Sequence, residues 1–263
     1  MPEAARQPDL SELTGSDRVL AVLRSLGGHP KGVALEQLAR ELRLPKSSLH
    51  RALATLHRAG FVDHDEGGEY RLGLELVRIA FAFHRDLDRR RLVEPALEAL
   101  VRRFAETAHY AELTGGEVVY LAMVVPADHA VQMTSRLGGR NPAHCTGIGK
   151  ALLAATLPDL AAVEAYVSEH GPLARRTGRT LVDAAALHAD LEATRARGYA
   201  LDDQESEHGV NCLAFAIYLE DPLRPTGAIS IAALAHRTPL ASLVAAADEA
   251  RALIETTLGP VTR

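Results

Sequence analysis

Apolar residues recur at helical spacing in two neighbouring segments near the start of the chain. In the first segment the spacing i, i+3, i+4 and i+7 is kept by Leu35, Leu38, Ala39 and Leu42. This spacing predicts an amphipathic helix with one stripe facing a core. The second segment, residues 46–58, follows Pro45, a residue that suits the first turn of a helix. Its apolar stripe consists of Leu49, Leu53 and Leu56. The pattern predicts two helices joined by a tight turn.

The opposite face of the second helix is polar and basic, with Lys46, Ser47, Ser48, His50, Arg51 and Thr55. Side chains of these types contact phosphates and base edges when a helix enters the major groove. We therefore predict that residues 46–58 read DNA and that Arg43, just before them, adds a contact.

A predicted hairpin follows the second helix. Residues 61–64 and 69–72 alternate like strands, and the turn between them contains two glycines. Two helices and a hairpin together predict a winged helix-turn-helix. The tip of this wing is acidic, so Arg71 at its base is the expected phosphate contact. The alternative is a unit of the same shape that mediates only protein contacts.

The rest of the chain alternates between strand and helix patterns. Strands are predicted at residues 110–113, 118–125, 130–136, 199–202, 211–218 and 226–233. Helices are predicted at residues 92–107, 147–156, 160–168, 187–197 and from 239 or 240 to 258. A sheet flanked by helices around a concave face is an α+β sensor layout.

A helical segment at residues 73–84 and a charged run at 85–91 are expected to connect the two parts. The predicted domains are residues 1–85, for DNA binding with a linker helix, and residues 86–263, for effector binding and oligomerisation. The chain of 263 residues, 47% of them hydrophobic, is long enough for both.

Charge and composition narrow the class of protein. The net charge is −5, but residues 1–85 carry 12 Lys or Arg against 11 Asp or Glu, which is +1, and the remainder carries −6. The basic residues Arg40, Arg43, Lys46, Arg51 and Arg58 share one short stretch with a single acid, Glu41. Local basic charge is sufficient for phosphate anchoring.

No apolar run approaches the roughly 18 residues of a membrane span, and the first residues lack a signal-peptide core. A cytoplasmic protein without membrane contact is therefore expected.

Four separated motifs resemble the IclR family of bacterial transcriptional regulators. They are residues 44–53, which are similar to its recognition helix, 70–73 at the wing exit, 144–151 beside its effector pocket, and 198–205 followed by 209–212. The resemblance implies a GAF-like C-terminal domain, a homodimer or dimer of dimers, and a small-molecule effector that alters binding to a double-stranded operator. A dimer would present two reading helices about 34 Å apart to a pseudo-palindrome. Whether the effector releases or tightens DNA binding stays open.

The turn at residues 146–149 leads into a predicted helix whose first N–H groups lack partners within the helix. Such a helix start favours a carboxylate, so a small organic acid or an aromatic metabolite is the expected effector. The spacing is not that of a P-loop, because His144 replaces the first glycine and Ala151 follows Lys150. A helix start that is packed without any ligand is the alternative.

The family resemblance also implies effector contacts. These fall on the backbone of Gly147 and Ile148 and on Asp202, Cys212 and Ser230, with apolar lining at Met133 and Val210. Two positions depart from relatives that bind small keto acids, because Ala232 replaces a second serine and Asn141 replaces an apolar residue. The changed donor pattern means that the effector need not be the same molecule. His109, Tyr110 and Met123 are further lining residues or, at strand spacing, core residues.

An enzymatic alternative rests on two cysteines. Cys145 and Cys212, with His144, His109 and Asp202, include the residue types of a Cys-His hydrolase. His144 and Cys145 could also begin a metal site, but adjacent residues seldom both reach one ion. Because nothing in the sequence places a base beside either thiol, we expect no enzyme, no cofactor and no metal. A sensor with hydrolytic activity through Cys145 or Cys212 is the alternative function.

Overall fold

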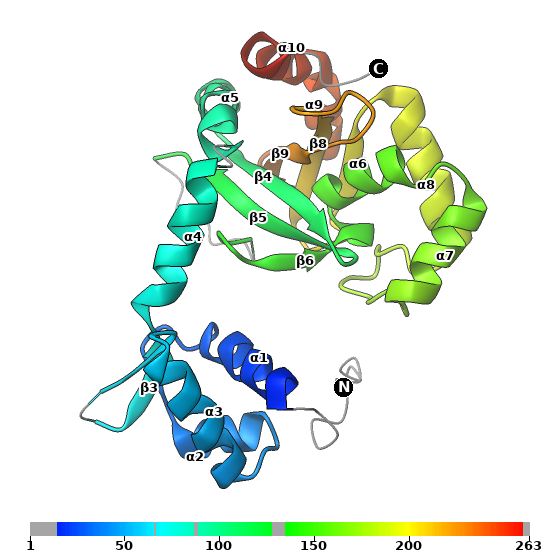
Figure 1. Ribbon diagram of the computed structural model, residues 1–263. Coiled ribbons are helices and arrows are strands. Elements are labelled where there is room, and N and C mark those ends of the chain that lie inside the picture. The colour runs from blue at the N-terminus through cyan, green and yellow to red at the C-terminus, as the bar shows by residue number, and fades with distance from the viewer. Residues whose placement is uncertain (1–14, 66, 87–88, 128–134, 260–263) are drawn as a thin grey trace. The chain divides into compact units, whose positions relative to one another are not determined.

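The computed structural model describes residues 15–65, 67–86, 89–127 and 135–259. The chain forms two compact units, Met1–Asp88 and Arg89–Arg263 (Figure 1). The first unit is drawn in blue and cyan and the second in green to red. Each unit has its own buried apolar core.

The first unit is a winged helix-turn-helix. Its elements are α1 (Gly15–Leu26), β1 (Val33–Ala34), α2 (Leu35–Glu41), α3 (Lys46–Arg58), β2 (Val62–His64), β3 (Glu69–Leu72) and α4 (Leu74–Asp86). The strands form an antiparallel sheet in the order β1-β3-β2. The predicted bounds of the reading helix and of the second wing strand are those of α3 and β3, whereas α1 and β1 were not predicted.

The core of this unit explains its local structure. The predicted stripes bury Leu38 on α2 and Leu49, Leu53 and Leu56 on α3. Val22 and Leu26 of α1 complete the same cluster. Pro45 lies just before the first turn of α3, at the N-cap. The tight turn before it depends on Arg43, whose φ of 49° is in the left-handed region.

The second unit is built on one antiparallel sheet of six strands, in the order β6-β5-β4-β9-β8-β7. The strands are β4 (Thr107–Thr114), β5 (Glu117–Val124), β6 (Arg140–Pro142), β7 (Ala200–Asp203), β8 (Val210–Ile217) and β9 (Gly227–Leu234). One face packs against α5 (Arg89–Phe104), α9 (Leu240–Ala245) and α10 (Ala247–Leu258). The other face packs against α6 (Gly147–Thr156), α7 (Leu160–His170) and α8 (Ala184–Arg197). A short 3₁₀ turn, η1 (Ala143–Cys145), precedes α6.

Alternation along the strands separates the two faces of the sheet. Tyr110, Phe215 and Ile229 point toward α5 and α10, whereas Ala111, Ala214 and Ala228 lie in the cluster under α6. Small residues on the α6 side let that helix approach the sheet closely. A Cβ on Gly147 would lie 3.1 Å from the Cβ of Cys212, and one on Gly149 would lie 2.1 Å from the carbonyl oxygen of Ala143. The glycines in the first turn of α6 therefore permit close packing against β8 and η1.

Several predicted bounds were wrong. The helix predicted at residues 92–107 ends at Phe104, because Ala105 takes a φ of 53° and the chain enters β4 at Thr107. The single last helix is two helices that meet at Ala246. Strand β6 was not predicted. The strand predicted at residues 130–136 lies largely outside the described residues, and its last two positions are not in a strand.

The charged run predicted as a connection belongs partly to α5. Arg89 begins that helix and binds two carboxylates of its own unit. Its guanidinium donates to Glu112 on β4 at 3.0 Å and to Glu220, beyond β8, at 2.8 Å. These ion pairs hold the first turn of α5 against the sheet.

Candidate DNA-binding and effector sites

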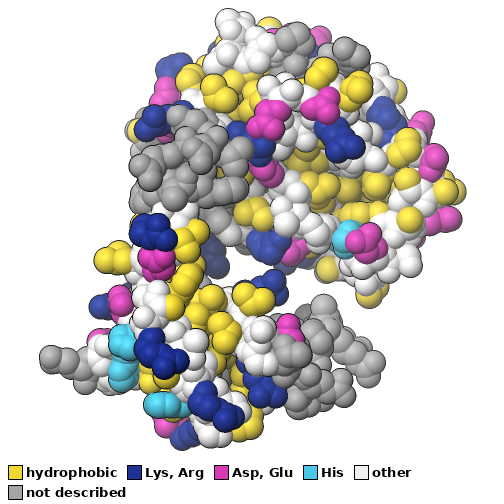
Figure 2. Space-filling view, viewed as in Figure 1, with side chains coloured by type: hydrophobic (Ala, Val, Ile, Leu, Met, Phe, Trp, Pro, Cys, Tyr) yellow, Lys and Arg dark blue, Asp and Glu magenta, His cyan; other side chains and the backbone are white. Residues whose placement is uncertain are grey.

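The residues predicted to contact DNA lie on the accessible side of α3 and around it. Arg43, Lys46, Ser47, His50, Arg51, Thr55 and Arg71 are exposed, and Ser48 is partly exposed. Figure 2 shows Lys, Arg and His side chains gathered on this unit. The opposite side of α3 is its buried apolar stripe. The helix therefore packs on the core with one face and presents polar side chains to solvent with the other.

The contacts made by this polar face are weak. Nζ of Lys46 lies 2.8 Å from Oε1 of Glu36, and both side chains are exposed. Nε of Arg71 lies 4.0 Å from Oδ2 of Asp63, also in solvent. Exposed ion pairs of this kind contribute little to stability, because solvent screens the charges. Both cations can therefore exchange a carboxylate for a phosphate at low cost.

The second unit contains a small polar cavity between its sheet and the start of α6. Its lining comes from all six strands, from the loops beside them and from the α6 turn: His109, Tyr120, Ser135, Asn141, Thr146, Gly147, Ile148, Asp202, Ser206, Glu207, Val210, Cys212, Ser230 and Ala232. The cavity has a volume of about 30 Å³, space for one or two water molecules.

The sequence assigned eight residues to the effector, and seven of them line this cavity: Asn141, Gly147, Ile148, Asp202, Val210, Cys212 and Ser230. Met133 lies outside the described residues. His109 lines the cavity, whereas Tyr110 points to the opposite side of the sheet, where its hydroxyl donates to Glu112 at 2.9 Å. Met123 is not part of the lining. Sequence reasoning missed Tyr120, Ser135, Thr146, Ser206 and Glu207.

The first turn of α6 presents backbone donors to the cavity. Thr146 caps the helix, because its Oγ1 accepts a hydrogen bond from the N–H of Gly149 at 3.0 Å. Gly147 and Ile148 line the cavity, and the N–H groups of a first helical turn have no partner within the helix. Partial positive charge from the helix dipole accumulates at this end. The α6 turn is thus suited to an anion.

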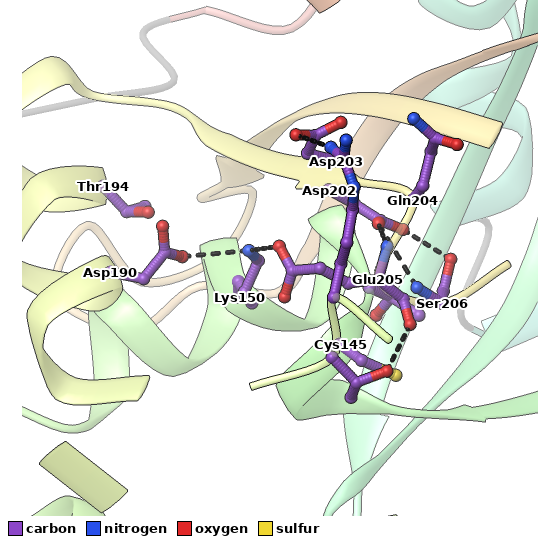
Figure 3. A network of polar contacts seen from close by, with 12 residues as sticks. Cys145, Lys150, Asp190, Thr194, Asp202, Asp203, Gln204, Glu205 and Ser206 are labelled. Carbon is purple, nitrogen blue, oxygen red and sulfur yellow. Dashed lines mark hydrogen bonds and ion pairs between the residues drawn. The ribbon is translucent and has the colours of Figure 1, made fainter. Parts of the chain in front are cut away.

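A buried carboxylate forms another part of the lining. Asp202 accepts hydrogen bonds from the N–H of Glu205 at 2.7 Å and from the hydroxyl of Ser206 at 2.5 Å (Figure 3). Burial raises the pKa of Asp202 to about 6, although these hydrogen bonds favour the charged form. The carboxyl group consequently changes charge near neutral pH.

A buried ion-pair cluster lies behind this part of the lining (Figure 3). Nζ of Lys150 contacts Oε1 of Glu205 at 2.5 Å and Oδ2 of Asp190 at 3.0 Å. Burial disfavours the ammonium group, but the two carboxylates outweigh that effect and raise the pKa of Lys150. Burial raises the pKa of Glu205 to about 7 despite its contact with Lys150. The cluster joins α6, α8 and the segment between β7 and β8.

The two cysteines lack the features of nucleophiles. Burial raises the pKa of Cys145 to about 12 and raises that of Cys212 well above its ordinary value. His144 hydrogen-bonds the carbonyl oxygen of Ala174 at 3.1 Å, and burial lowers its pKa. Reactive cysteines need a lowered pKa, so this geometry gives the hydrolase alternative no support. In the described part of the chain no group of three or more His, Cys, Asp or Glu side chains is placed to hold a metal ion.

Comparison with known proteins covers both units. Residues 16–66 match the IclR helix-turn-helix domain, and residues 82–255 match the C-terminal domain of bacterial IclR transcriptional regulators. The chain belongs to the IclR family. IclR proteins are transcriptional regulators, with an N-terminal domain that binds DNA and a C-terminal domain that binds an effector. The family, the fold class and the regulatory function predicted from the sequence are thereby confirmed.

Individual IclR relatives are similar over most of their length. The HTH-type transcriptional regulator XynR of Escherichia coli K12 is 33% identical, over 86% of this chain and 88% of that protein. The transcriptional repressor IclR of the same organism is 32% identical, over 88% and 83%. An IclR homolog from Microbacterium hydrocarbonoxydans, solved with 4-hydroxybenzoate, has a TM-score of 0.77 at 26% identity and covers 93% of this chain and 99% of its own. Both Escherichia coli relatives are named as transcriptional regulators. None of the helices in the described ranges has the length and apolarity to cross a bilayer.

Proposed function

We propose that this regulator binds a pseudo-palindromic operator through α3, as a dimer or a dimer of dimers, and that a small organic acid in the C-terminal cavity changes its operator affinity. The observation that carries the proposal is the cavity itself, which gathers seven of the eight effector residues that the family resemblance implied. Residues 1–85 are the proposed DNA-binding domain and residues 86–263 the proposed effector and oligomerisation domain. The protein acts where its operator lies, in the bacterial cytoplasm.

The proposed DNA contacts divide into two kinds. Ser47, Ser48, His50 and Arg51, on the exposed face of α3, are placed to read base edges. Arg43, Lys46, Thr55 and Arg71 are placed to contact phosphates, which position the helix without specifying sequence. Exposure of these side chains and the low cost of exchanging the Lys46 and Arg71 ion pairs support this division.

The proposed effector contacts use complementary chemistry. A carboxylate accepts hydrogen bonds from the N–H groups of Gly147 and Ile148, where the helix dipole favours negative charge. Asp202, Cys212 and Ser230 supply polar contacts, Asn141 an amide, and Met133 and Val210 apolar lining. The IclR homolog that binds 4-hydroxybenzoate supports an acid as the class of effector. Effector coupling of about 1–3 kcal/mol, typical of allostery, changes operator affinity by roughly 5 to 150-fold.

Selection of bound DNA tests the proposal. Purified protein is incubated with fragments of its genome at about 0.15 M salt, the bound DNA is sequenced, and candidate acids are titrated against the recovered site. The expected result is an inverted repeat whose affinity changes when one acid is added. Binding that only follows the salt concentration, with no enriched sequence, would contradict the proposed operator recognition.

A further inference from the structure

The lining of the cavity in β4, β5, β6 and the loop before β6 differs chemically from its lining at α6 and β7. It contains two hydrogen-bonded pairs of neutral side chains. Oγ of Ser135 lies 2.9 Å from Nε2 of His109, and Nδ2 of Asn141 donates to the hydroxyl of Tyr120 at 3.3 Å. The rings of His109 and Tyr120 lie 5.3 Å apart, measured between centroids, so the two pairs are neighbours.

Each pair leaves hydrogen-bonding capacity unused. Among the residues that the structure describes, the Tyr120 hydroxyl accepts from Asn141 and donates to no other group, and burial raises its pKa so that the proton is retained. The oxygen of Ser135 keeps a lone pair whether it donates to His109 or accepts from it. A donor or acceptor that is shielded from water and left without a partner is destabilising. The wall formed by His109, Ser135, Tyr120 and Asn141 therefore presents both a donor and an acceptor to a molecule in the cavity.

These four side chains carry no charge at neutral pH. His109 is 2% exposed, and burial lowers its pKa to about 4, so its ring is neutral. The wall therefore offers no cation that would pair with a second carboxylate. A hydroxyl group, which donates one hydrogen bond and accepts others, matches the free donor and the free acceptor together.

We infer that His109, Ser135, Tyr120 and Asn141 form a hydroxyl-recognising subsite, and that the effector is a hydroxylated acid. This inference rests on the proposed effector function and specifies the chemical class of the effector. The carboxylate binds at the α6 turn and the hydroxyl binds between Tyr120 and Ser135. An acid of the same size without the hydroxyl leaves the donor and the acceptor unpaired.

Matched pairs of acids test the subsite by calorimetry on the full-length protein. The pairs are glycolate and acetate, lactate and propionate, and 4-hydroxybenzoate and benzoate, with malonate as a probe for a second carboxylate. In at least one pair we expect the hydroxylated member to bind at least about 10-fold more tightly, since sites built to hydrogen-bond a hydroxyl reject analogues that lack it. Acids that bind with no preference for the hydroxyl, or tighter binding of malonate, would overturn the subsite and leave the proposed effector function standing. If no acid binds, the proposed effector class fails and the subsite with it.

Variants separate the subsite from general damage to the fold. Tyr120→Phe removes the donor, together with the oxygen that accepts from the Asn141 amide, and should reduce the hydroxyl preference to less than about twofold. Ser135→Ala should reduce the same preference. Tyr166→Phe is the matched control, because its hydroxyl binds the carbonyl oxygen of Gly116 and its ring does not line the cavity. A preference that survives both Tyr120→Phe and Ser135→Ala would overturn the assignment.

Discussion

Nζ of Lys150 lies 2.5 Å from Oε1 of Glu205, and both side chains are buried. The two residues are 55 positions apart in the chain. Lys150 lies on α6, the helix whose first turn contributes to the cavity, and Glu205 follows Asp202 by three positions. This ion pair therefore connects the helix to the segment that presents the cavity carboxylate.

Lys150→Met should destabilise the protein strongly. Removing one partner of a buried ion pair leaves the other charge without compensation, which costs about 3–5 kcal/mol. The cost should be smaller near pH 5 than near pH 8, because Glu205, whose pKa is about 7 in the intact pair, is then protonated and uncharged. Urea denaturation at the two pH values measures the free energy of unfolding. Lys46→Met is the matched control, since its pair with Glu36 is exposed and should contribute little to stability.

Asp202→Asn should change how stability depends on pH. The pKa of Asp202 is about 6 in the folded protein against an ordinary 3.8, so the folded state binds this proton more tightly than the unfolded state. Its contribution to stability is therefore present below about pH 4 and is lost as the pH rises through 6. Relative to the variant, the wild-type free energy of unfolding should fall by about 3 kcal/mol across that interval. Curves that run parallel from pH 4 to 7 would refute the raised pKa.

Arg51→Ala should weaken operator binding without affecting the effector. A bidentate contact to a base contributes about 1–3 kcal/mol of discrimination, so we expect roughly 5 to 150-fold weaker binding in a gel-shift or anisotropy titration. Arg102→Ala is the control, because Arg102 is equally a surface arginine but lies on α5. Equal loss of operator and effector affinity in a folded Arg51 variant would contradict the division of roles between the two units.

Ser230→Ala should weaken the effector response while operator affinity in the absence of effector stays unchanged. Ser230 is 4% exposed and lines the cavity. Loss of one buried hydrogen bond to a ligand corresponds to roughly 10-fold weaker binding. Titration of the effector against the protein–operator complex measures this change, with the exposed Ser242→Ala on α9 as control. An unchanged titration would remove Ser230 from the effector contacts.

Local signals predicted the helices at the centre of both sites. The bounds of α3 and α6 agree with the sequence prediction because a proline precedes one helix and a capping threonine precedes the other. Helix α1 also has a local pattern, since Val19, Val22, Leu23 and Leu26 keep helical spacing. The end of α5 had none, because Ala105 adopts a left-handed φ that alanine rarely takes.

Short strands and long-range contacts were beyond local signals. Strand β1 has two residues and exists because Val33 pairs with Tyr70, and β6 has three residues that pair with β5. The family resemblance named the effector residues on β7, β8 and β9. It did not reveal the Lys150 cluster or the Tyr120 and Ser135 pairs, because these depend on which distant segments the sheet brings together.

The cavity lining includes residues of every strand of the six-stranded sheet, from Asn141 on β6 to Asp202 on β7. Those two strands are the edges of the sheet, and edge strands open most readily because they are hydrogen-bonded on one side only. A molecule that fills the cavity would contact both edge strands at once and so stabilise them together. Its arrival would slow amide exchange in β6 and β7 together, although these strands never touch each other.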